Sequence, residues 1–313
     1  MVTQPTITLA ASASRTTLPP SVAELRCVIQ QRLVAAIQRQ VTVRAMVDLQ
    51  LRNNVRVIGN GAATIMFAHG FGCDQTMWRL FAPAYSERYR VVLFDHVGGG
   101  RSDLTAYDRL KYDSLQGYAD DVLELAKEFG RGPVFFVGHS VSAMIGMLAD
   151  LKEPATFAGH VMVGPSPCYI NDGDYIGGFT RKDIDGLLET LQENYLGWAS
   201  NMAPAIMGAP QQPELGQELT NSFCRTDPEI AKQFARVTFL SDVRAELTRL
   251  KTQTLIIQCN DDLIAPISVG EYMHRQIPSS TLAIIENVGH CPHLSSPGPV
   301  AAAMDAFLEA GGH

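Results

Sequence analysis

The stretch FFVGHSVSAMIGML, residues 135–148, decides the fold. An apolar run ends at Gly138, and a pattern typical of a helix begins directly after Ser140. A serine at such a sharp strand-to-helix turn is poorly placed for packing and well placed to face a substrate. The motif follows the G-x-S-x-G pattern, with the small residue Ser142 in the last position. The stretch therefore predicts a nucleophilic serine between a strand and a helix.

The segments around this stretch alternate between two patterns. Runs rich in β-branched and apolar residues, typical of strands buried on both faces, occupy 55–59, 64–68, 91–95, 134–138, 160–164, 254–259 and 281–286. Helical patterns lie between them at 75–86, 114–129, 141–152, 268–277 and 298–310. This alternation predicts an α/β fold, with a mostly parallel sheet flanked by helices.

One interval, 166–250, breaks the alternation. It has no convincing strand and holds helical patterns near 180–197, 198–208, 213–225 and 227–240. We interpret it as a four-helix cap inserted before the last two strands, over the carboxyl ends where ligands bind in such sheets. The core is then formed by 48–165 and 251–313.

The composition limits the class of protein. Apolar residues make up 46% of the 313 residues, which is enough for a large core. A net charge of −7 argues against nucleic acid or an anionic membrane as the main partner. No apolar run reaches the length needed to span a bilayer. The six cysteines form no CxxC pair, which favours reduced thiols in a cytoplasmic enzyme.

The first 47 residues differ from the rest, with five arginines and a single acidic residue, Glu24. This pattern is typical of an organelle transit peptide, and also of a translated upstream region with Met46 as the true start. A surface helix at 22–41 is the third interpretation. We predict a dispensable extension.

The nucleophile needs a base, and the base needs a carboxylate that holds its tautomer. Asp262 follows the strand pattern at 254–259, and His290 follows the one at 281–286. The order Ser140, Asp262, His290 is the one this fold requires. Asp261 stays open as the acid, and His293 stays open as the base.

Two backbone amides are candidates for the oxyanion hole. One belongs to Val141, at the start of the helix after the nucleophile. The other belongs to Phe71, in the loop of MFAHGFG, residues 66–72. Such donors stabilise the negative charge that forms on the attacked carbonyl oxygen.

The apolar and aromatic residues of the cap predict a small, neutral, hydrophobic substrate. We expect four side chains to line its pocket: His69, Phe179, Trp198 and Met207. The glycine-rich segment 94–103 lacks the phosphate-loop pattern. No cluster has metal-ligand spacing. We therefore predict no cofactor and no metal.

Longer stretches resemble a known family. They are IMFAHGFGCDQTMW, VVLFDHVGGGRSDL, VGHSVSAMIGMLA, VMVGPSPCYINDG, FCRTDPEIAKQFA and QCNDDLIAP followed by VGHCPH. Over about residues 50–310 the chain resembles the α/β-hydrolase superfamily, and within it the RsbQ-like hydrolases and the related karrikin and strigolactone receptor hydrolases.

The resemblance implies Ser140 as nucleophile, His290 as base and Asp262 as acid, since the family acid lies four residues before a proline, here Pro266. It also implies a four-helix cap over a hydrophobic pocket. For RsbQ-like proteins it implies a partner phosphatase with a PAS-type sensor domain and a role in stress signalling.

The predicted function is that of a cofactor-independent serine hydrolase acting on a small hydrophobic ester or lactone. One alternative is a ligand-sensing signalling module whose partner phosphatase contacts the cap. Another is a metabolic enzyme with the same triad: an esterase, a C–C hydrolase or a cofactor-free haloperoxidase.

Overall fold

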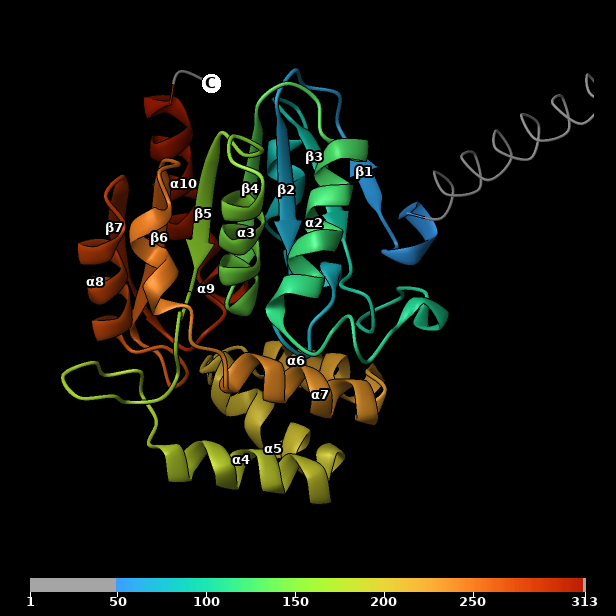
Figure 1. The fold of residues 1–313 in the computed structure, drawn as a ribbon, viewed down its shortest axis with the longest axis vertical. Helices are drawn as coiled ribbons and strands as arrows, with labels where there is room; N and C mark the ends of the chain where they lie inside the picture. Colours follow the sequence, from blue (N-terminus) through green and yellow to red (C-terminus); the bar gives the residue numbers. More distant parts are fainter. Residues whose placement is uncertain (1–48, 312–313) are drawn as a thin grey trace, which may run out of the picture. The chain divides into compact units, whose positions relative to one another are not determined.

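The computed structural model describes residues 49–311, so the predictions for the N-terminal extension lie outside the described residues. The strands of the described part form one seven-stranded sheet in the order β1-β3-β2-β4-β5-β6-β7 (Figure 1). They are β1 (Arg56–Ile58), β2 (Thr64–Ala68), β3 (Arg90–Phe94), β4 (Val134–His139), β5 (Gly159–Val163), β6 (Thr254–Asp261) and β7 (Ser280–Val288). Only the β1–β3 pair is antiparallel, so the carboxyl ends of β2 to β7 meet at one edge.

Helices cover both faces of the sheet, because alternate residues of each strand point to opposite sides. Met66 and Phe136 pack with α2 (Leu115–Phe129), α3 (Val141–Lys152) and α8 (Ile267–Gln276). Ile65 and Phe67 belong to a second cluster on the other face. That cluster includes residues of α10 (Pro297–Ala310), which follows the short helix α9 (Pro292–Ser295).

Four helices lie between β5 and β6, at the carboxyl edge of the sheet (Figure 1). They are α4 (Arg181–Glu193), α5 (Tyr195–Met207), α6 (Pro213–Arg225) and α7 (Pro228–Phe239). Local signals fix their ends: Thr180 and Asp183 form a capping box, and Asp227 accepts hydrogen bonds at the start of α7. The break between α4 and α5 falls at Asn194, earlier than predicted, because its side chain caps α5.

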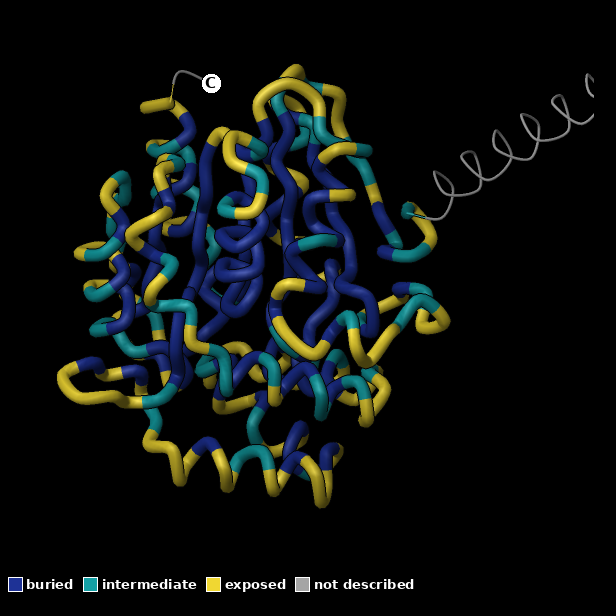
Figure 2. Tube along the Cα trace, in the orientation of Figure 1, coloured by how far each residue is buried: buried dark blue, intermediate teal, exposed yellow. Residues whose placement is uncertain are grey.

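Other segments also differ from the sequence predictions. The helix predicted at 75–86 is two short 3-10 helices, η1 (Gln75–Trp78) and η2 (Ala82–Tyr85). Further 3-10 helices are η3 (Leu104–Ala106) and η4 (Arg244–Arg249). The edge strands β1 and β7 are not buried on both faces, unlike the central strands (Figure 2).

Two features of the described residues bear on the wider predictions. The five cysteines within 49–311 are all free thiols. No helix in this part of the chain is both long and apolar enough to cross a bilayer.

Candidate active site

Ser140 lies at the turn between β4 and α3 with a backbone φ of 56° and ψ of −125°. A positive φ is uncommon for a residue other than glycine and stores strain where function requires it. Gly138 permits the turn, since a Cβ there would lie 2.6 Å from the amide nitrogen of Ala143. The local geometry therefore needs a small residue two positions before the serine, and it places Ser140 at the carboxyl edge of the sheet.

Three predicted site residues meet at this edge. His290 Nε2 lies 2.8 Å from Ser140 Oγ, and His290 Nδ1 lies 2.7 Å from Asp262 Oδ2. All three side chains are buried. Asp261, the alternative acid, ends β6 as an exposed residue, and its backbone carbonyl accepts a hydrogen bond from the amide of Gly289.

The Asp262 carboxylate is held in its ionised form. Burial raises its pKa, but the charge of His290, the hydrogen bond from that ring and two backbone hydrogen bonds outweigh burial and lower the pKa. The amides of Ile264 and Ala265 donate to Asp262 Oδ1, which leaves Oδ2 for the histidine. An ionised carboxylate in this position fixes the proton on His290 Nδ1, so that Nε2 faces the serine as an acceptor.

The backbone of His290 is held from two sides. Its carbonyl accepts a hydrogen bond from His139 Nε2 in the core, and its amide donates to the carbonyl of Ile206 at the end of α5. The chain approaches the cap so closely here that a Cβ on Gly289, whose φ is 108°, would lie 2.0 Å from the carbonyl oxygen of Met207. Glycine is therefore required before the histidine, and both core and cap position the base.

The two amides predicted for the oxyanion hole have no hydrogen-bond acceptor among residues 49–311. Both therefore stay available to a ligand: Val141 as the first residue of α3, and Phe71 in the loop after β2. The loop is tied to the nucleophile turn through Ser142, whose hydroxyl donates to the carbonyl of His69. The single proton of Ser142 is used in that bond, so His96 Nε2, 2.7 Å from the same oxygen, must be the donor to it.

The tautomer of His69 follows from its partners in the same way. The amide of His96 donates to His69 Nε2 at 3.0 Å, so that nitrogen carries no proton. His69 Nδ1 then donates to the carbonyl of Gly70 at 2.9 Å. The loop that presents Phe71 is thus held from both its backbone and its histidine ring.

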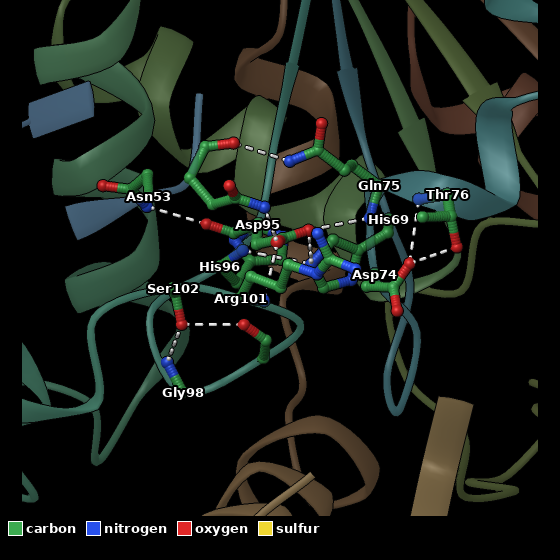
Figure 3. A network of polar contacts seen from close by, with 12 residues as sticks. Asn53, His69, Asp74, Gln75, Thr76, Asp95, His96, Gly98, Arg101 and Ser102 are labelled. Atoms are coloured by element: carbon green, nitrogen blue, oxygen red, sulfur yellow. Dashed lines mark hydrogen bonds and ion pairs between the residues drawn. The ribbon is translucent and has the colours of Figure 1, made fainter. Parts of the chain in front are cut away.

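The glycine-rich segment after β3 forms a polar centre behind this loop (Figure 3). The Asp95 carboxylate accepts hydrogen bonds from the amides of Gln75 and Arg101 and from the side chain of Asn54. Gly100 has a φ of 55°, and a Cβ there would lie 2.4 Å from that carboxylate. The glycines of this turn therefore serve a close approach within the protein.

A small cavity lies at Ser140, between the carboxyl edge of the sheet and the cap helices. It is lined by Phe71, Cys73, His139, Ser140, Tyr169, Ile206, Leu219, Phe223, Thr238, Phe239, Ile264, His290 and Cys291. Larger hollows exist at the surface, including one beside α7, but none of the triad lines it. We take the smaller cavity as the candidate active site because Ser140 and His290 line it.

The four side chains predicted to line this pocket lie outside its wall. Trp198 is buried behind the residues of the wall. The centroid of its ring lies 6.2 Å from that of Phe71 and 5.5 Å from that of Phe223, and both of these rings line the cavity. Met207 is buried next to Ile206, which lines the cavity in its place. His69 faces the polar network, and Phe179, half-buried, packs against the apolar cluster outside the cavity.

Two residues that carry hydroxyls, Tyr169 and Thr238, line the cavity and were not among the four side chains predicted for its wall. Burial raises the pKa of Tyr169 to about 12, so its hydroxyl keeps its proton and remains a donor. Its position a few residues past the end of β5 is a signal that sequence analysis can use, since this strand ends at the same edge as β4. Thr238 gives no such signal, because it lies within a cap helix.

His293, the alternative base, has a different place. Its ring packs against Trp78 with a centroid distance of 4.3 Å and against His139 at 4.7 Å. Both of its ring nitrogens are buried and have no partner among the described residues. Burial lowers its pKa well below the usual range, so the ring is neutral. Neither Ser140 nor Asp262 is hydrogen-bonded to it.

Within residues 49–311, no group of three or more histidine, cysteine or acidic side chains is arranged to hold a metal ion. The site consists of a buried serine, a histidine hydrogen-bonded to both the serine and an ionised carboxylate, and two amides without an acceptor among the described residues. A family model described as the alpha/beta hydrolase family matches residues 65–303. The chain belongs to the α/β-hydrolase family. The predicted fold class and the prediction that the protein is a hydrolase are confirmed.

Named relatives cover most of this α/β-hydrolase. A protein of Petunia hybrida named karrikin insensitive 2 receptor CA is 39% identical over 249 residues, which are 79% of this chain and 92% of that protein. The strigolactone esterase D14 of Arabidopsis thaliana is 36% identical, over 79% of this chain and 93% of that protein. A solved hydrolase from Oleispira antarctica is 42% identical with a TM-score of 0.82, covering 84% and 97% of the two chains.

Proposed function

We propose that this α/β-hydrolase is a serine esterase or lactonase for small hydrophobic substrates. The single observation that carries the proposal is the hydrogen-bond chain from Ser140 through His290 to Asp262 at the wall of an apolar cavity. Ser140 Oγ attacks the carbonyl carbon of the substrate, and His290 Nε2 takes the hydroxyl proton at the same time. The amides of Phe71 and Val141 stabilise the oxyanion, and His290 returns the proton to the leaving oxygen.

The acyl-enzyme is then hydrolysed by the same groups. Water enters where the leaving group has departed, His290 removes one of its protons, and the second tetrahedral intermediate collapses to release the acid and restore Ser140. One water molecule is consumed for each bond cleaved, and the enzyme is regenerated with Ser140 and His290 in their starting states. A lactone follows the same path, with its leaving oxygen still attached to the acyl chain.

The test is a stopped-flow time course with p-nitrophenyl acetate. We expect wild type to turn over and Ser140→Ala to lose essentially all activity. Asp262→Asn should lose about 10³-fold or more of kcat, since an amide stabilises the wrong tautomer of His290. Asp261→Asn is the matched control and should keep most of the activity. Turnover near the wild-type rate in Ser140→Ala would refute the mechanism.

A second candidate function is ligand sensing, which the similarity to the Petunia karrikin receptor over 92% of that protein supports. In this case the protein would hydrolyse its ligand slowly and keep the ligand or its product bound, and a partner protein would contact the cap in that state. The RsbQ-like resemblance makes a phosphatase with a PAS-type domain the candidate partner, and a cytoplasmic location goes with it. A burst of about one equivalent followed by slow turnover would favour sensing. Fast turnover without a burst would favour a metabolic esterase.

A further inference from the structure

The wall of the active cavity that comes from the cap helices contains one polar side chain, that of Thr238, near the end of α7. The other residues that α4 to α7 contribute to this wall are apolar: Ile206, Leu219, Phe223 and Phe239. Thr238 is 1% exposed, and its hydroxyl has no hydrogen-bond partner within residues 49–311.

A buried hydroxyl without a partner is unusual in a helix. Threonine and serine in helices commonly donate to the carbonyl four residues earlier. In the cap, Thr190, Ser200 and Thr220 each do so. Thr238 does not, although the same geometry is open to any threonine in a helix. Leaving a buried hydroxyl unpaired lowers the stability of the fold. Because this hydroxyl belongs to a residue of the cavity wall, a bound ligand can supply the missing partner.

The cavity shows where that partner comes from. Its core wall holds Ser140 and His290, where the carbonyl of the substrate reacts, and its cap wall holds Thr238. A substrate that fills the cavity therefore extends from the nucleophile to this hydroxyl. We infer that Thr238 Oγ1 donates a hydrogen bond to a second oxygen of the substrate, remote from the attacked carbonyl.

This inference rests on the proposed function and narrows its substrate class. The substrate is a small, mostly apolar ester or lactone that carries an ether or carbonyl oxygen at the end away from the scissile bond. A purely hydrocarbon acyl group leaves the Thr238 hydroxyl unpaired and is therefore the poorer substrate. Discrimination of this kind is strong where a site contains a buried group that needs a partner.

The test compares three pairs of p-nitrophenyl esters: butanoate with methoxyacetate, pentanoate with 3-methoxypropanoate, and hexanoate with 4-methoxybutanoate. Each pair has the same chain length and differs by one ether oxygen. The intrinsic reactivities differ, but they cancel when the ratio of kcat/KM within a pair is compared between wild type and a variant. The three pairs place the oxygen at three distances from the carbonyl.

The variants are Thr238→Val, which keeps the shape and removes the hydroxyl, and Thr238→Ser, which keeps the hydroxyl. Thr220→Val is the matched control, because Thr220 is a buried cap threonine outside the cavity wall. For at least one pair, the preference for the ether ester should fall about fivefold to tenfold in Thr238→Val. It should return in Thr238→Ser and stay unchanged in Thr220→Val.

A thermal unfolding measurement tests whether the Thr238 hydroxyl lacks a hydrogen-bond partner within the protein. Thr238→Val should melt at or above the wild-type Tm, whereas Thr220→Val should melt below it, since only the second change breaks a hydrogen bond. A fall in Tm as large as that of Thr220→Val would overturn the inference.

The remaining outcomes separate this inference from the proposed function. If wild type hydrolyses the esters and the ratios are the same in Thr238→Val for all three pairs, Thr238 does not bind the substrate and only this inference is lost. If wild type hydrolyses none of the six esters, the proposed function fails and this inference fails with it.

Discussion

Behind the core wall of the active cavity, a polar network is held by hydrogen bonds with defined proton positions, whereas the wall that the cap helices supply is almost wholly apolar. His69, His96 and Ser142 each have one arrangement of donors and acceptors. The cap helices contribute aliphatic and aromatic side chains and the single hydroxyl of Thr238. The difference supports a division of labour in the proposed function, in which the core fixes most of the reacting groups and the cap supplies most of the surface that the substrate contacts.

The two sides also meet in different ways. The carbonyl of Ile206 accepts a hydrogen bond from the amide of His290, which is a buried contact. Two ion pairs also join α6 to the core: Arg225 pairs with the buried carboxylate of Asp74, and Arg79 pairs with Glu218 at the surface. Three predictions follow from this contrast between buried polar groups in the core and apolar packing with surface charge in the cap.

The largest expected effect concerns acid stability. Burial lowers the pKa of three core histidines, His96, His139 and His293, and that of His139 falls to about 3. The rings stay neutral in the fold, while the unfolded chain binds a proton on each as the pH falls below 6.5. Each ring then removes about 1.4 kcal/mol of unfolding free energy per pH unit. Urea unfolding should show a loss of about 6 kcal/mol between pH 7.5 and pH 5.

His293→Phe is the variant that isolates one ring, since it keeps the packing against Trp78 and cannot be protonated. The slope of unfolding free energy against pH, between pH 6 and pH 5, should fall by about 1.4 kcal/mol per pH unit. At pH 7.5 the variant should be at least as stable as wild type, because two unpaired buried nitrogens are removed. An unchanged slope would mean that His293 is charged in the fold.

A smaller effect, on kcat, is expected when Ser142 is changed. Its hydroxyl joins the turn that holds Ser140 to the loop after β2 that contains Phe71. Ser142→Ala leaves His96 Nε2 and the carbonyl of His69 without their partner. Loss of an oxyanion donor costs about 10²- to 10³-fold in kcat, and here the donor is loosened rather than removed, so we expect about tenfold. KM should change by less than about twofold, because the substrate contacts are intact.

The control for this variant is Ser102→Ala. Ser102 is also buried, and among residues 49–311 its hydroxyl is hydrogen-bonded only within its own turn, to the amide of Gly98 and the carbonyl of Gly99 (Figure 3). Its removal should leave kcat nearly unchanged. Equal losses of kcat in the two variants would show that Ser142 acts through general stability rather than through the position of the loop.

The fold followed from the sequence because its signals are local. The central strands are short, continuous apolar runs, and Gly138, two residues before Ser140, marks a turn that few residues permit. The edge strands were harder to interpret, since β7 carries apolar residues such as Ile284 and Val288 that remain exposed. A run of apolar residues indicates that a strand forms, but it does not show whether one or both faces of that strand are buried.

The wall of the cavity could not be derived in the same way. Met207 was predicted to line it and Ile206 does so instead, because successive residues of a helix differ by about 100° in direction. Spacing along α5 gives the relative faces but not which face meets the core. Thr238 was missed because its significance lies in a missing partner, which only the packed structure reveals. The triad roles of Ser140, Asp262 and His290 stay predictions until they are tested.

The smallest effect is expected where the cap is joined to the core by charge. Arg79 and Glu218 form an ion pair with both side chains more than a third exposed to solvent. Exposed ion pairs contribute roughly 0.2–1 kcal/mol, because water and salt screen them. A double-mutant cycle with Arg79→Ala and Glu218→Ala should therefore give a coupling energy in that range, which falls further in 1 M salt.

The same cycle measures how the cap is held over the active site. If apolar packing holds it, KM for p-nitrophenyl acetate should change by less than about twofold in either single variant, because one exposed pair adds little to the buried contacts of α5 and α6. A coupling energy above about 2 kcal/mol, or a KM that rises steeply with salt in wild type, would contradict this. The cap would then be held on the core mainly by ion pairs and would open as the ionic strength rises. The cap wall of the cavity would in that case be less firmly fixed than the core wall.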